Sequence, residues 1–306
     1  MPKEILEHDE TFVFKQIEKE LGKSKQDLEK DSQIVEDWLK TQPHLPEIPS
    51  KAVIQSFILF NKFSIEATKQ KLDMYYTIRK TLPEFFKKHP CSPEMVLAAK
   101  VEYIFPLPKL SKDARRIIYI KINEDYGPES FSFEAFVAHI YNVYEILFRE
   151  DLFVGAHFII DCVALQMSHA TKLNLMTMKK TSIVSEKVFS NRVASINLIN
   201  VPPFIEGTLK LVNAALPEKV RSRLEVHKNA DDMLKLFSKK ILPKDIGGDE
   251  ESLATLADLW SKKFEEYKTL FDKLTTINVD ESKRPTKLVN DELLGFYGNF
   301  KKLDVD

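Results

Sequence analysis

The residues with the clearest chemical potential lie near the middle of the chain. Cys162 directly follows Asp161, and His157 and His169 lie nearby in the sequence. A thiol next to an imidazole can act as a nucleophile. Nothing else specifies a triad, however, and Cys91 lacks even such neighbours. We therefore interpret Asp161 and His169 as a structural pair at a strand end, and we expect no catalytic residues and no enzyme.

Other kinds of chemistry find little support in the sequence. It contains no HExxH motif, zinc-ligand spacing, calcium loop or phosphate loop, so we expect no metal and no cofactor. The 45 basic and 46 acidic residues nearly cancel. Without a basic face and interleaved aromatic residues, we expect no nucleic-acid partner. Any anionic partner must be bound by a local patch.

Two isolated cysteines favour a reducing compartment. The charged N-terminus does not resemble a signal peptide, and no apolar run approaches the ~18 residues of a membrane span. We therefore expect a cytoplasmic protein.

The elements that would position functional residues differ between the two parts of the chain. The first ~100 residues show helical patterns. Ile34, Val35, Trp38 and Leu39 form one apolar stripe, and Ser50, Ser64 and Ser92 are expected helix N-caps. "SKAVIQSFILFNKF" is apolar nearly all round, which indicates a buried helix.

Strands are expected after this region, at 115–122, 154–161, 194–200 and in "RLEVH". Helices are expected between them, at 132–150 and roughly 169–189, and after them at 253–274. Helices alternating with strands predict an α/β fold with a mainly parallel sheet. The expected units are a helical domain over 1–94, a sheet domain over 95–252, and a C-terminal helix and tail over 253–306.

One segment, "INLINVPPFIEGTLKLVNAALPEKVRSRLEVH", combines a strand, two prolines, an apolar helix and alternating charges. Ile205, Leu209, Val212 and Leu216 form one face of this helix, and Phe204 widens it. From the pattern alone, this is a core helix packed on the sheet. Lys219, Arg221 and Arg223 alternate with uncharged residues, so an extended chain would place them on one face, as a solvated strand edge.

The order of several motifs resembles that of the CRAL-TRIO lipid-transfer family, including insect members related to α-tocopherol transfer protein. "DWLKTQPHLPEIPSKAVIQSFILFNKFSIEATKQKLDMYYTIRKTLPEFF" resembles the family's N-terminal helical domain. "VGAHFIIDCVALQMSH", the segment above and "LPKDIGG" resemble successive landmarks of its lipid-binding domain, and the tail "LLGFYGNFKKLDVD" is similar to tails of insect members. The resemblance implies an apolar pocket for one lipid, a mobile gate helix that lids this pocket, and no catalysis.

The resemblance also implies a site for membrane phosphoinositides. Basic residues of the family's tocopherol branch match Lys219 and Arg223, and a third matches Arg192; Arg221 lies between the first two. The chain departs from the family at "FILFNKF", where Leu59 and Asn61 replace arginines and only Lys62 keeps a charge. The patch is therefore incomplete, and a phosphatidylinositol headgroup site like that of the yeast members is in doubt.

Residues of the pocket can be proposed from one helix, from one face of a strand and from the segments that flank the gate. For the helical and strand candidates, ordinary core packing is the alternative to ligand contact; they are Phe133, Phe136, Val137, Ile140, Tyr144, His157 and Ile159, with Asp161 on the same strand face. Phe158 and Ile160 are expected on the opposite face. Residues flanking the gate are favoured as ligand contacts: Phe189, Ile196, Leu198, Ile205, Leu209 and Val212.

Two functional hypotheses remain open. The first is a carrier that binds one small hydrophobic lipid, such as a tocopherol, a retinoid, a carotenoid or another isoprenoid-like lipid, and exchanges it at membranes. The second is a phosphoinositide-dependent sensor or adaptor that moves no cargo. Both predict peripheral, reversible contact with anionic or phosphoinositide-containing membranes.

Overall fold

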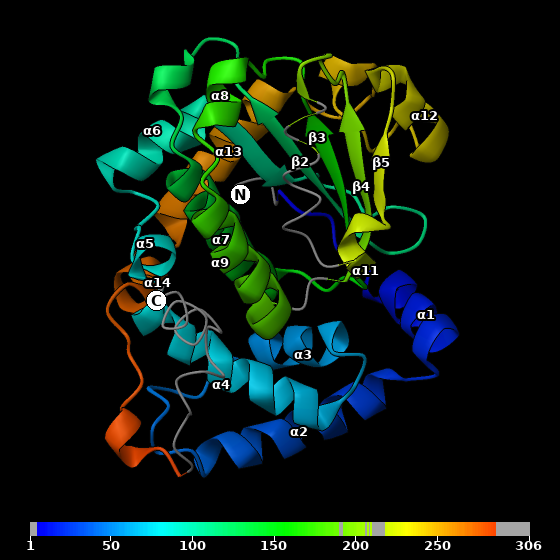
Figure 1. The fold of residues 1–306 in the computed structure, drawn as a ribbon. Coiled ribbons are helices and arrows are strands. Elements are labelled where there is room, and N and C mark those ends of the chain that lie inside the picture. Colours follow the sequence, from blue (N-terminus) through cyan, green and yellow to red (C-terminus); the bar gives the residue numbers. More distant parts are fainter. Residues whose placement is uncertain (1–4, 190–191, 206, 208, 210–217, 286–306) are drawn as a thin grey trace, which may run out of the picture.

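The computed structural model describes residues 5–189, 192–205, 207, 209 and 218–285. A group of helices from the N-terminal part of the chain lies below a sheet that carries helices on both faces (Figure 1). This confirms the predicted fold class of a helical region followed by a mainly parallel sheet.

The N-terminal helices begin where capping residues predict them. Ser64 and Ser92 accept hydrogen bonds from the backbone N–H groups of Ala67 and Met95, as expected. Ser50 also precedes a helix, but its side chain makes no capping bond. The helices are α1 (Glu10–Leu21), α2 (Lys25–Lys40), α3 (Lys51–Phe60), α4 (Ile65–Thr81), α5 (Pro83–Phe86) and α6 (Pro93–Val101).

Burial of these helices agrees with the sequence pattern except at one residue. Helix α3 is buried over most of its length, as its all-round apolar character predicts. Val35 and Leu39 of α2 are also buried. Ile34 was expected on the same stripe, but it is 42% exposed. Val35 and Leu39 are four residues apart and share one side of the helix, whereas Ile34 is rotated away from that side by about 100°.

The sheet has five strands in the order β1-β2-β3-β4-β5. Strand β1 pairs antiparallel with β2, and the other pairings are parallel. The sequence patterns predicted four of the strands and missed β1, which follows α6 without a turn signal. The bounds are β1 (Glu102–Pro106), β2 (Arg116–Ile122), β3 (Ala156–Asp161), β4 (Val193–Ile199) and β5 (Leu224–Val226).

The helix expected at 132–150 is present as α7, whereas two other later helices are divided where the patterns predicted continuous ones. The helix expected at 169–189 is divided into α8, α9 and a π-helical turn over 185–189, and the one expected at 253–274 is interrupted at Tyr267. The bounds are α7 (Phe133–Glu150), α8 (Met167–Thr171), α9 (Leu175–Val184), α11 (Glu218–Arg221), α12 (Met233–Leu236), α13 (Leu253–Glu266) and α14 (Lys268–Leu274).

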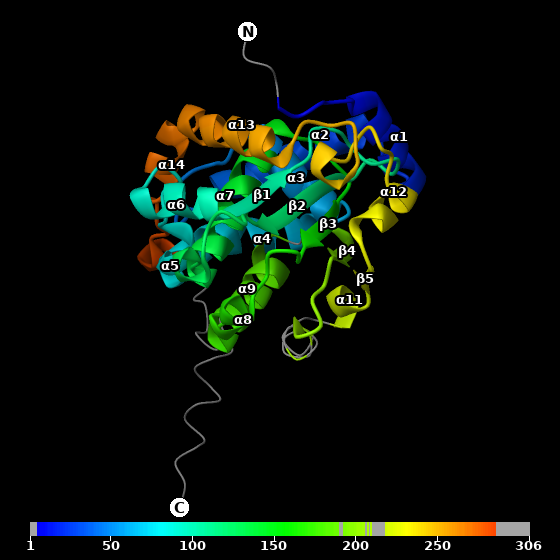
Figure 2. The ribbon, with the colours of Figure 1, turned by 90° about the horizontal axis from the view of Figure 1, so that it is seen from above.

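The two faces of the sheet have different neighbours. Figure 2 shows α12 and α13 on one side of the sheet and α8 and α9 on the other. Phe237, directly after α12, lies against His157 of β3 with 5.1 Å between ring centroids. On the other side, the start of α7 packs near Ile122 of β2 through Phe133 and Phe136. We call these the α13 face and the α7 face.

Candidate functional site

The α7 face carries a row of apolar side chains that are only partly buried. Phe158 pairs with Ile196 across β3 and β4, and Ile160 pairs with Leu198. Because paired residues point to the same side of a sheet, these four share one face. Leu198 is buried, whereas the other three are half-buried and keep accessible apolar surface.

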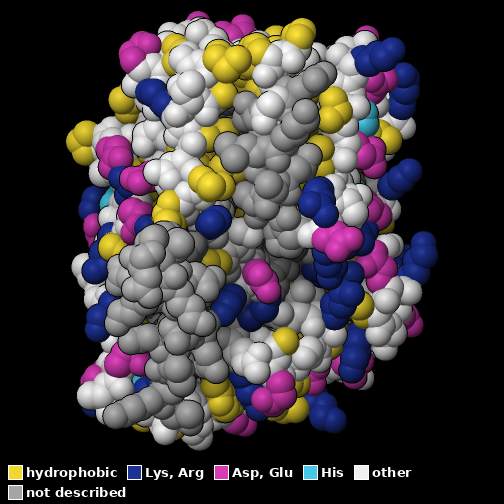
Figure 3. All heavy atoms as spheres, viewed as in Figure 1, with side chains coloured by type: hydrophobic (Ala, Val, Ile, Leu, Met, Phe, Trp, Pro, Cys, Tyr) yellow, Lys and Arg dark blue, Asp and Glu magenta, His cyan; other side chains and the backbone are white. Residues whose placement is uncertain are grey.

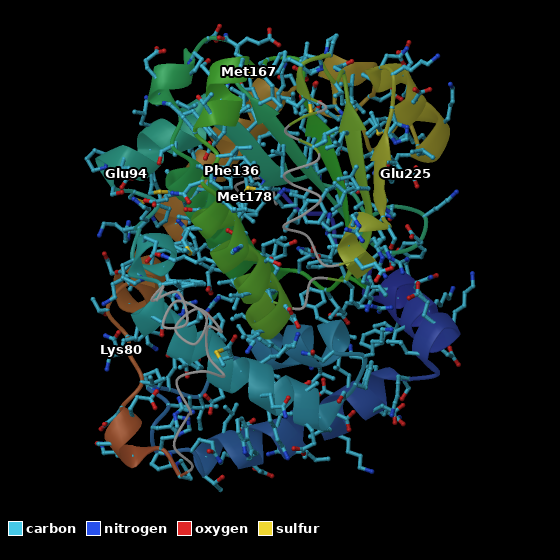
Figure 4. All side chains as sticks on the ribbon, viewed as in Figure 1. Lys80, Glu94, Phe136, Met167, Met178 and Glu225 are labelled. Carbon is cyan, nitrogen blue, oxygen red and sulfur yellow. The ribbon has the colours of Figure 1, made fainter. Side chains whose placement is uncertain are left out.

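Helix α7 presents a matching apolar stripe. Phe133, Phe136 and Ile140 recur at helical spacing, and all three are half-buried, while Val137 is buried. Figure 4 labels Phe136 of α7 and Met178 of α9, two helices that contact each other. An apolar wall of partly accessible side chains is therefore formed by β3, β4 and α7.

The strand register corrects the proposed set of pocket residues. His157 pairs with Ser195 and Ile159 pairs with Asn197, so both lie on the face opposite Ile196 and Leu198. One cavity on one face of the sheet cannot be lined by both pairs. Phe158 and Ile160, which the sequence analysis placed outside the pocket, occupy the same face as Ile196 and Leu198.

His157 instead belongs to a polar network beside the α13 face. Its Nδ1 lies 2.8 Å from the Ser195 hydroxyl oxygen, and its Nε2 lies 3.2 Å from a carboxylate oxygen of Asp113. The Asn197 side-chain amide donates to Ser195 at 2.8 Å. Ser195 lies within the ladder of β4, so its hydroxyl is held in a regular strand rather than in a sharp, exposed turn.

Tyr144 and Phe189 form an aromatic cluster with other rings. Phe189 is 1% exposed and stacks on Tyr144 and Tyr141, with ring centroids 5.9 and 5.0 Å apart. Both hydroxyl groups are buried. That of Tyr144 has no hydrogen-bond partner among the described residues, whereas the Tyr141 hydroxyl lies near the side chains of Thr181 and Ser185. Burial therefore raises the pKa of each tyrosine.

The expected gate segment is described only at its beginning. Ile205 donates a backbone hydrogen bond to the Pro202 carbonyl at 3.0 Å and is buried. Phe204 and Leu209 are half-buried. Val212 and Leu216 lie outside the described residues.

The basic triplet does not lie on an extended chain. Lys219 and Arg221 belong to α11 and are exposed, because residues 218–221 form a helical turn before β5 begins. Arg223 is half-buried and donates to the Val193 carbonyl oxygen. The predicted one-sided alternation is therefore wrong, although the three residues stay close together in space.

Other elements bring further cations to this region. Burial lowers the pKa of Arg192, and the nearby charges of Arg115 and Arg223 lower it further, whereas Glu20 acts in the opposite direction. Lys219 acts in the same way on Lys71 of α4, whose pKa is lowered mainly by burial. Lys62 is exposed at the corner between α3 and α4, next to Phe63, whose ring lies 5.6 Å from the Lys23 Nζ. Figure 3 shows Lys and Arg side chains gathered on this face, around α11 and α1.

We call the residues Lys62, Arg115, Arg192, Lys219, Arg221 and Arg223 the basic patch. Sequence reasoning missed Arg115, because its proximity to Arg192 depends on the parallel pairing of strands that begin far apart in the chain.

The side chains of Cys162, Asp161 and His169 make separate local contacts. Burial raises the pKa of the Cys162 thiol to about 12, and its Sγ lies 3.7 Å from the Ile160 carbonyl oxygen. Asp161 accepts hydrogen bonds from the Tyr119 hydroxyl and the Asn200 amide, not from His169. His169 instead accepts the Gln166 backbone N–H at the start of its own helix, so the expected Asp161–His169 pair is not formed.

In the described part of the chain, no group of three or more His, Cys, Asp or Glu side chains is arranged to hold a metal ion. Within the same residues, no helix combines the length and apolar character needed to cross a bilayer.

Four apolar side chains near α8 are exposed and were not singled out from the sequence. Val163 and Met167 are 51% and 55% exposed, and Leu175 and Met176 are 44% and 37% exposed. Figure 4 places Met167 at the end of the molecule where α8 lies, and Figure 2 shows α8 and α9 on the side of the sheet away from α13. We call these four residues the α8 apolar surface. The signal in the sequence that could have indicated this surface was the presence of apolar residues within a mainly polar helical pattern.

Comparison with known proteins gives matches over most of the chain. Residues 24–95 match the Pinta-like UBA domain, and residues 100–248 match the CRAL/TRIO domain. A Homo sapiens protein named alpha-tocopherol transfer protein-like is 24% identical over 234 residues, covering 74% of this chain and 67% of the relative. Homo sapiens Clavesin-2 is 24% identical over 281 residues, covering 90% of this chain and 84% of the relative.

A solved structure is also similar. The crystal structure of Sfh5 matches with a TM-score of 0.46 and 9% identity, covering 79% of this chain and 97% of that chain. The domain match over residues 100–248, which contain all five strands of the sheet, identifies this part of the chain as a CRAL-TRIO domain, the domain of a lipid-binding and lipid-transfer family.

Proposed function

We propose that this protein is a carrier that binds one small hydrophobic lipid between the α7 face of the sheet and helices α7 and α9, and exchanges it at membranes. The observation that carries the proposal is the partly accessible apolar wall made by Phe158, Ile160 and Ile196 opposite the α7 stripe. Buried sheet faces normally exclude solvent from their apolar side chains. Incomplete burial on an inner face suits an apolar ligand.

Energetics explain why such a carrier needs direct membrane contact. A cargo with ~20 buried carbons, at ~0.8 kcal/mol for each CH₂, meets a barrier of about 15 kcal/mol to entering water. Spontaneous release into water is therefore very slow. Exchange becomes fast when the cargo passes directly from the pocket to a bilayer.

Two surfaces support membrane contact. The α8 apolar surface offers four exposed side chains beside the proposed pocket. The basic patch offers exposed Lys219 and Arg221, which make no ion pair among the described residues. Each Lys or Arg near an anionic leaflet contributes about 1 kcal/mol.

The proposal includes the gate that the sequence suggested. Its support is the apolar face of Ile205 and Leu209, continued by Val212 and Leu216 in the sequence. One face of this helix would cover the cargo and enter the bilayer during exchange. The cargo is proposed to be a tocopherol, a retinoid, a carotenoid or a similar lipid; a relative's name, alpha-tocopherol transfer protein-like, supports the first of these.

A second function is favoured by the extent of the basic patch. Its residues come from the α3–α4 corner, the segment before β2, the residue before β4 and α11. A site spread over so many elements suits recognition of a phosphoinositide surface even without cargo transfer. The alternative is therefore a membrane sensor or adaptor.

The first experiment is to purify the protein under non-denaturing conditions, extract it with organic solvent and identify bound lipid by mass spectrometry. One defined hydrophobic molecule per chain would support the carrier. If the protein is empty, transfer of labelled lipids between vesicles distinguishes the two functions. Transfer whose rate rises with protein amount supports the carrier, whereas vesicle binding without transfer supports the adaptor.

A further inference from the structure

Glu20 of helix α1 lies between two arginines of the basic patch. Its Oε2 accepts a hydrogen bond from Arg192 Nη2 at 2.8 Å, and its Oε1 accepts one from Arg115 Nη2, also at 2.8 Å. The Gln16 side-chain amide donates to the same Oε1 at 2.7 Å. The side chains of Glu20, Arg115 and Arg192 are 20%, 15% and 15% exposed, so the cluster is shielded but reachable from solvent.

The Glu20 carboxylate does not supply a hydrogen-bond acceptor for every N–H group of the two arginines that it contacts. Arg192 Nη1 is buried and has no hydrogen-bond partner among the described residues. Arg115 Nη1 donates to Asp113, so two acids, Glu20 and Asp113, contact Arg115. The positive charge of Arg223, in contrast, adds to that of Arg192. Even with Asp113 on Arg115, Glu20 therefore leaves positive charge and at least one N–H donor, Arg192 Nη1, uncompensated. A phosphate group, with more charge and a third oxygen, suits these donors better.

The position of Arg192 is set by the backbone. Its carbonyl accepts the Ala156 N–H at 2.9 Å, which joins the segment before β4 to the start of β3. A Cβ on Gly155 would lie 2.3 Å from the same carbonyl oxygen, so only glycine permits this approach. The arginine therefore has a fixed anchor, whereas Glu20 reaches it from the last turns of a separate surface helix.

Electrostatics agree with a strong interaction. Burial alone would raise the pKa of Glu20, but hydrogen bonds from Gln16 and Arg115 and the charges of Arg115 and Arg192 hold it below its usual value. Glu20 is therefore ionised at neutral pH and acts as a permanent internal counter-anion.

We propose that Glu20 occupies the place of a lipid headgroup phosphate between Arg115 and Arg192, so that α1 masks this site until an anionic membrane displaces the carboxylate. The inference rests on the proposed contact with phosphoinositide-containing membranes. It adds Arg115 to the headgroup-binding residues and assigns α1, which precedes both matched domains, a regulatory role.

The test compares Glu20→Gln with Glu18→Gln. Both substitutions remove one negative charge from the same helix, but Glu18 is exposed and makes no ion pair among the described residues. Binding is measured by flotation with phosphatidylcholine vesicles that contain phosphatidylinositol bisphosphate, and with phosphatidylcholine vesicles alone. Glu20→Gln should bind the phosphoinositide vesicles about fivefold or more tightly, and Glu18→Gln should bind like the unchanged protein.

A second pair of variants tests Arg115. Arg115→Gln should remove the gain when it is combined with Glu20→Gln, whereas Arg115→Lys should keep part of it. Soluble inositol trisphosphate distinguishes the source of the phosphate. If it competes with the vesicles, the phosphate group alone suffices; if it does not, the phosphate must be presented by a bilayer. Circular dichroism confirms that each variant is folded.

The outcomes separate this inference from the function beneath it. If the unchanged protein binds phosphoinositide vesicles and Glu20→Gln binds no better, the masking role is wrong and the membrane proposal stands. If neither protein binds, both proposals fail. Binding by Glu20→Gln alone supports masking most directly.

Discussion

Phe158 and Ile196 are direct partners across strands β3 and β4, so their side chains lie on the same face of the sheet. His157 and Ser195, one residue earlier in each strand, point to the opposite face. This pairing locates the proposed cargo wall on the α7 face and assigns His157 to the polar network with Asp113.

Filling this wall should block cargo binding. Ile196→Trp places a larger side chain where a half-buried isoleucine leaves accessible surface. We expect affinity for the lipid identified by mass spectrometry to fall about tenfold or more, which corresponds to about 1.4 kcal/mol.

The matched control is Leu236→Trp on α12. Leu236 is 41% exposed and lies near the α13 face. Lipid titration by fluorescence should show unchanged affinity for this variant. Equal affinity in both variants would place the cargo away from β4.

The α8 apolar surface should contribute to membrane contact independently of charge. Met167→Asp should weaken binding to uncharged phosphatidylcholine vesicles several-fold, because the exposed thioether chain would otherwise enter the bilayer. Ile34→Asp, which alters a 42% exposed isoleucine on α2, should leave binding unchanged. Equal losses in a vesicle flotation assay would show that the effect is a general one of added charge.

The exposed cations of α11 should act through charge alone. Lys219→Ala combined with Arg221→Ala should lower affinity for phosphoinositide vesicles about tenfold or more, since each cation contributes about 1 kcal/mol. Cargo affinity should stay the same, and the loss should shrink as salt is added.

The control for α11 removes the same charge elsewhere. Lys80 and Lys87 are exposed, and Figure 4 places Lys80 on the far side of the molecule from α11. Replacing both with Ala should change vesicle binding little. Arg223 is less suitable for this test than the sequence suggested, because its bond to the Val193 carbonyl also supports the fold.

Much of the fold could be predicted because its signals are local. Capping serines and proline started α4 and α6 where they were expected, and β-branched runs located β2 to β4. Strand β1 was missed because it continues directly from α6, with no glycine or proline between them.

The candidate site could be predicted only in part, because it depends on long-range pairing. Within β3 and within β4, the sequence shows which side chains alternate between the two faces. Only the register between the strands shows that His157 and Ile196 lie on opposite faces of the sheet. Likewise, nothing near Glu20 in the sequence indicates that it binds Arg115 and Arg192, which lie far away along the chain. The prediction of an extended chain at Lys219 and Arg221 was wrong because so short a segment fits both a helical and an extended conformation.

The buried pair Glu102 and His139 should make stability depend on pH. Burial raises the pKa of Glu102 well above its usual value and lowers the pKa of His139 to about 4, and the two side chains lie 3.6 Å apart. Burial therefore favours the uncharged form of both groups in the folded protein. The Glu102 carboxyl must keep a proton that it loses in the unfolded chain above pH ~4.5.

Glu102→Gln should consequently stabilise the protein more as the pH rises. A group whose folded pKa is raised contributes stability below its unfolded pKa and loses it as pH increases toward the folded value. The difference in unfolding free energy between Glu102→Gln and the unchanged protein should grow from pH 5 to pH 7 by up to about 1.4 kcal/mol per pH unit. His139 is present in both proteins, so only the part of its contribution that depends on Glu102 remains in this difference.

Urea unfolding at several pH values measures this slope, and Glu134→Gln provides the control. Glu134 is exposed on α7, the same helix that carries His139, and its substitution should give a difference that stays flat with pH. A flat difference for Glu102→Gln as well would show that Glu102 is ionised in the folded protein. His139, whose Nδ1 lies 3.6 Å from Glu102 Oε1, would then be the group that takes up the proton and pairs with the ionised carboxylate.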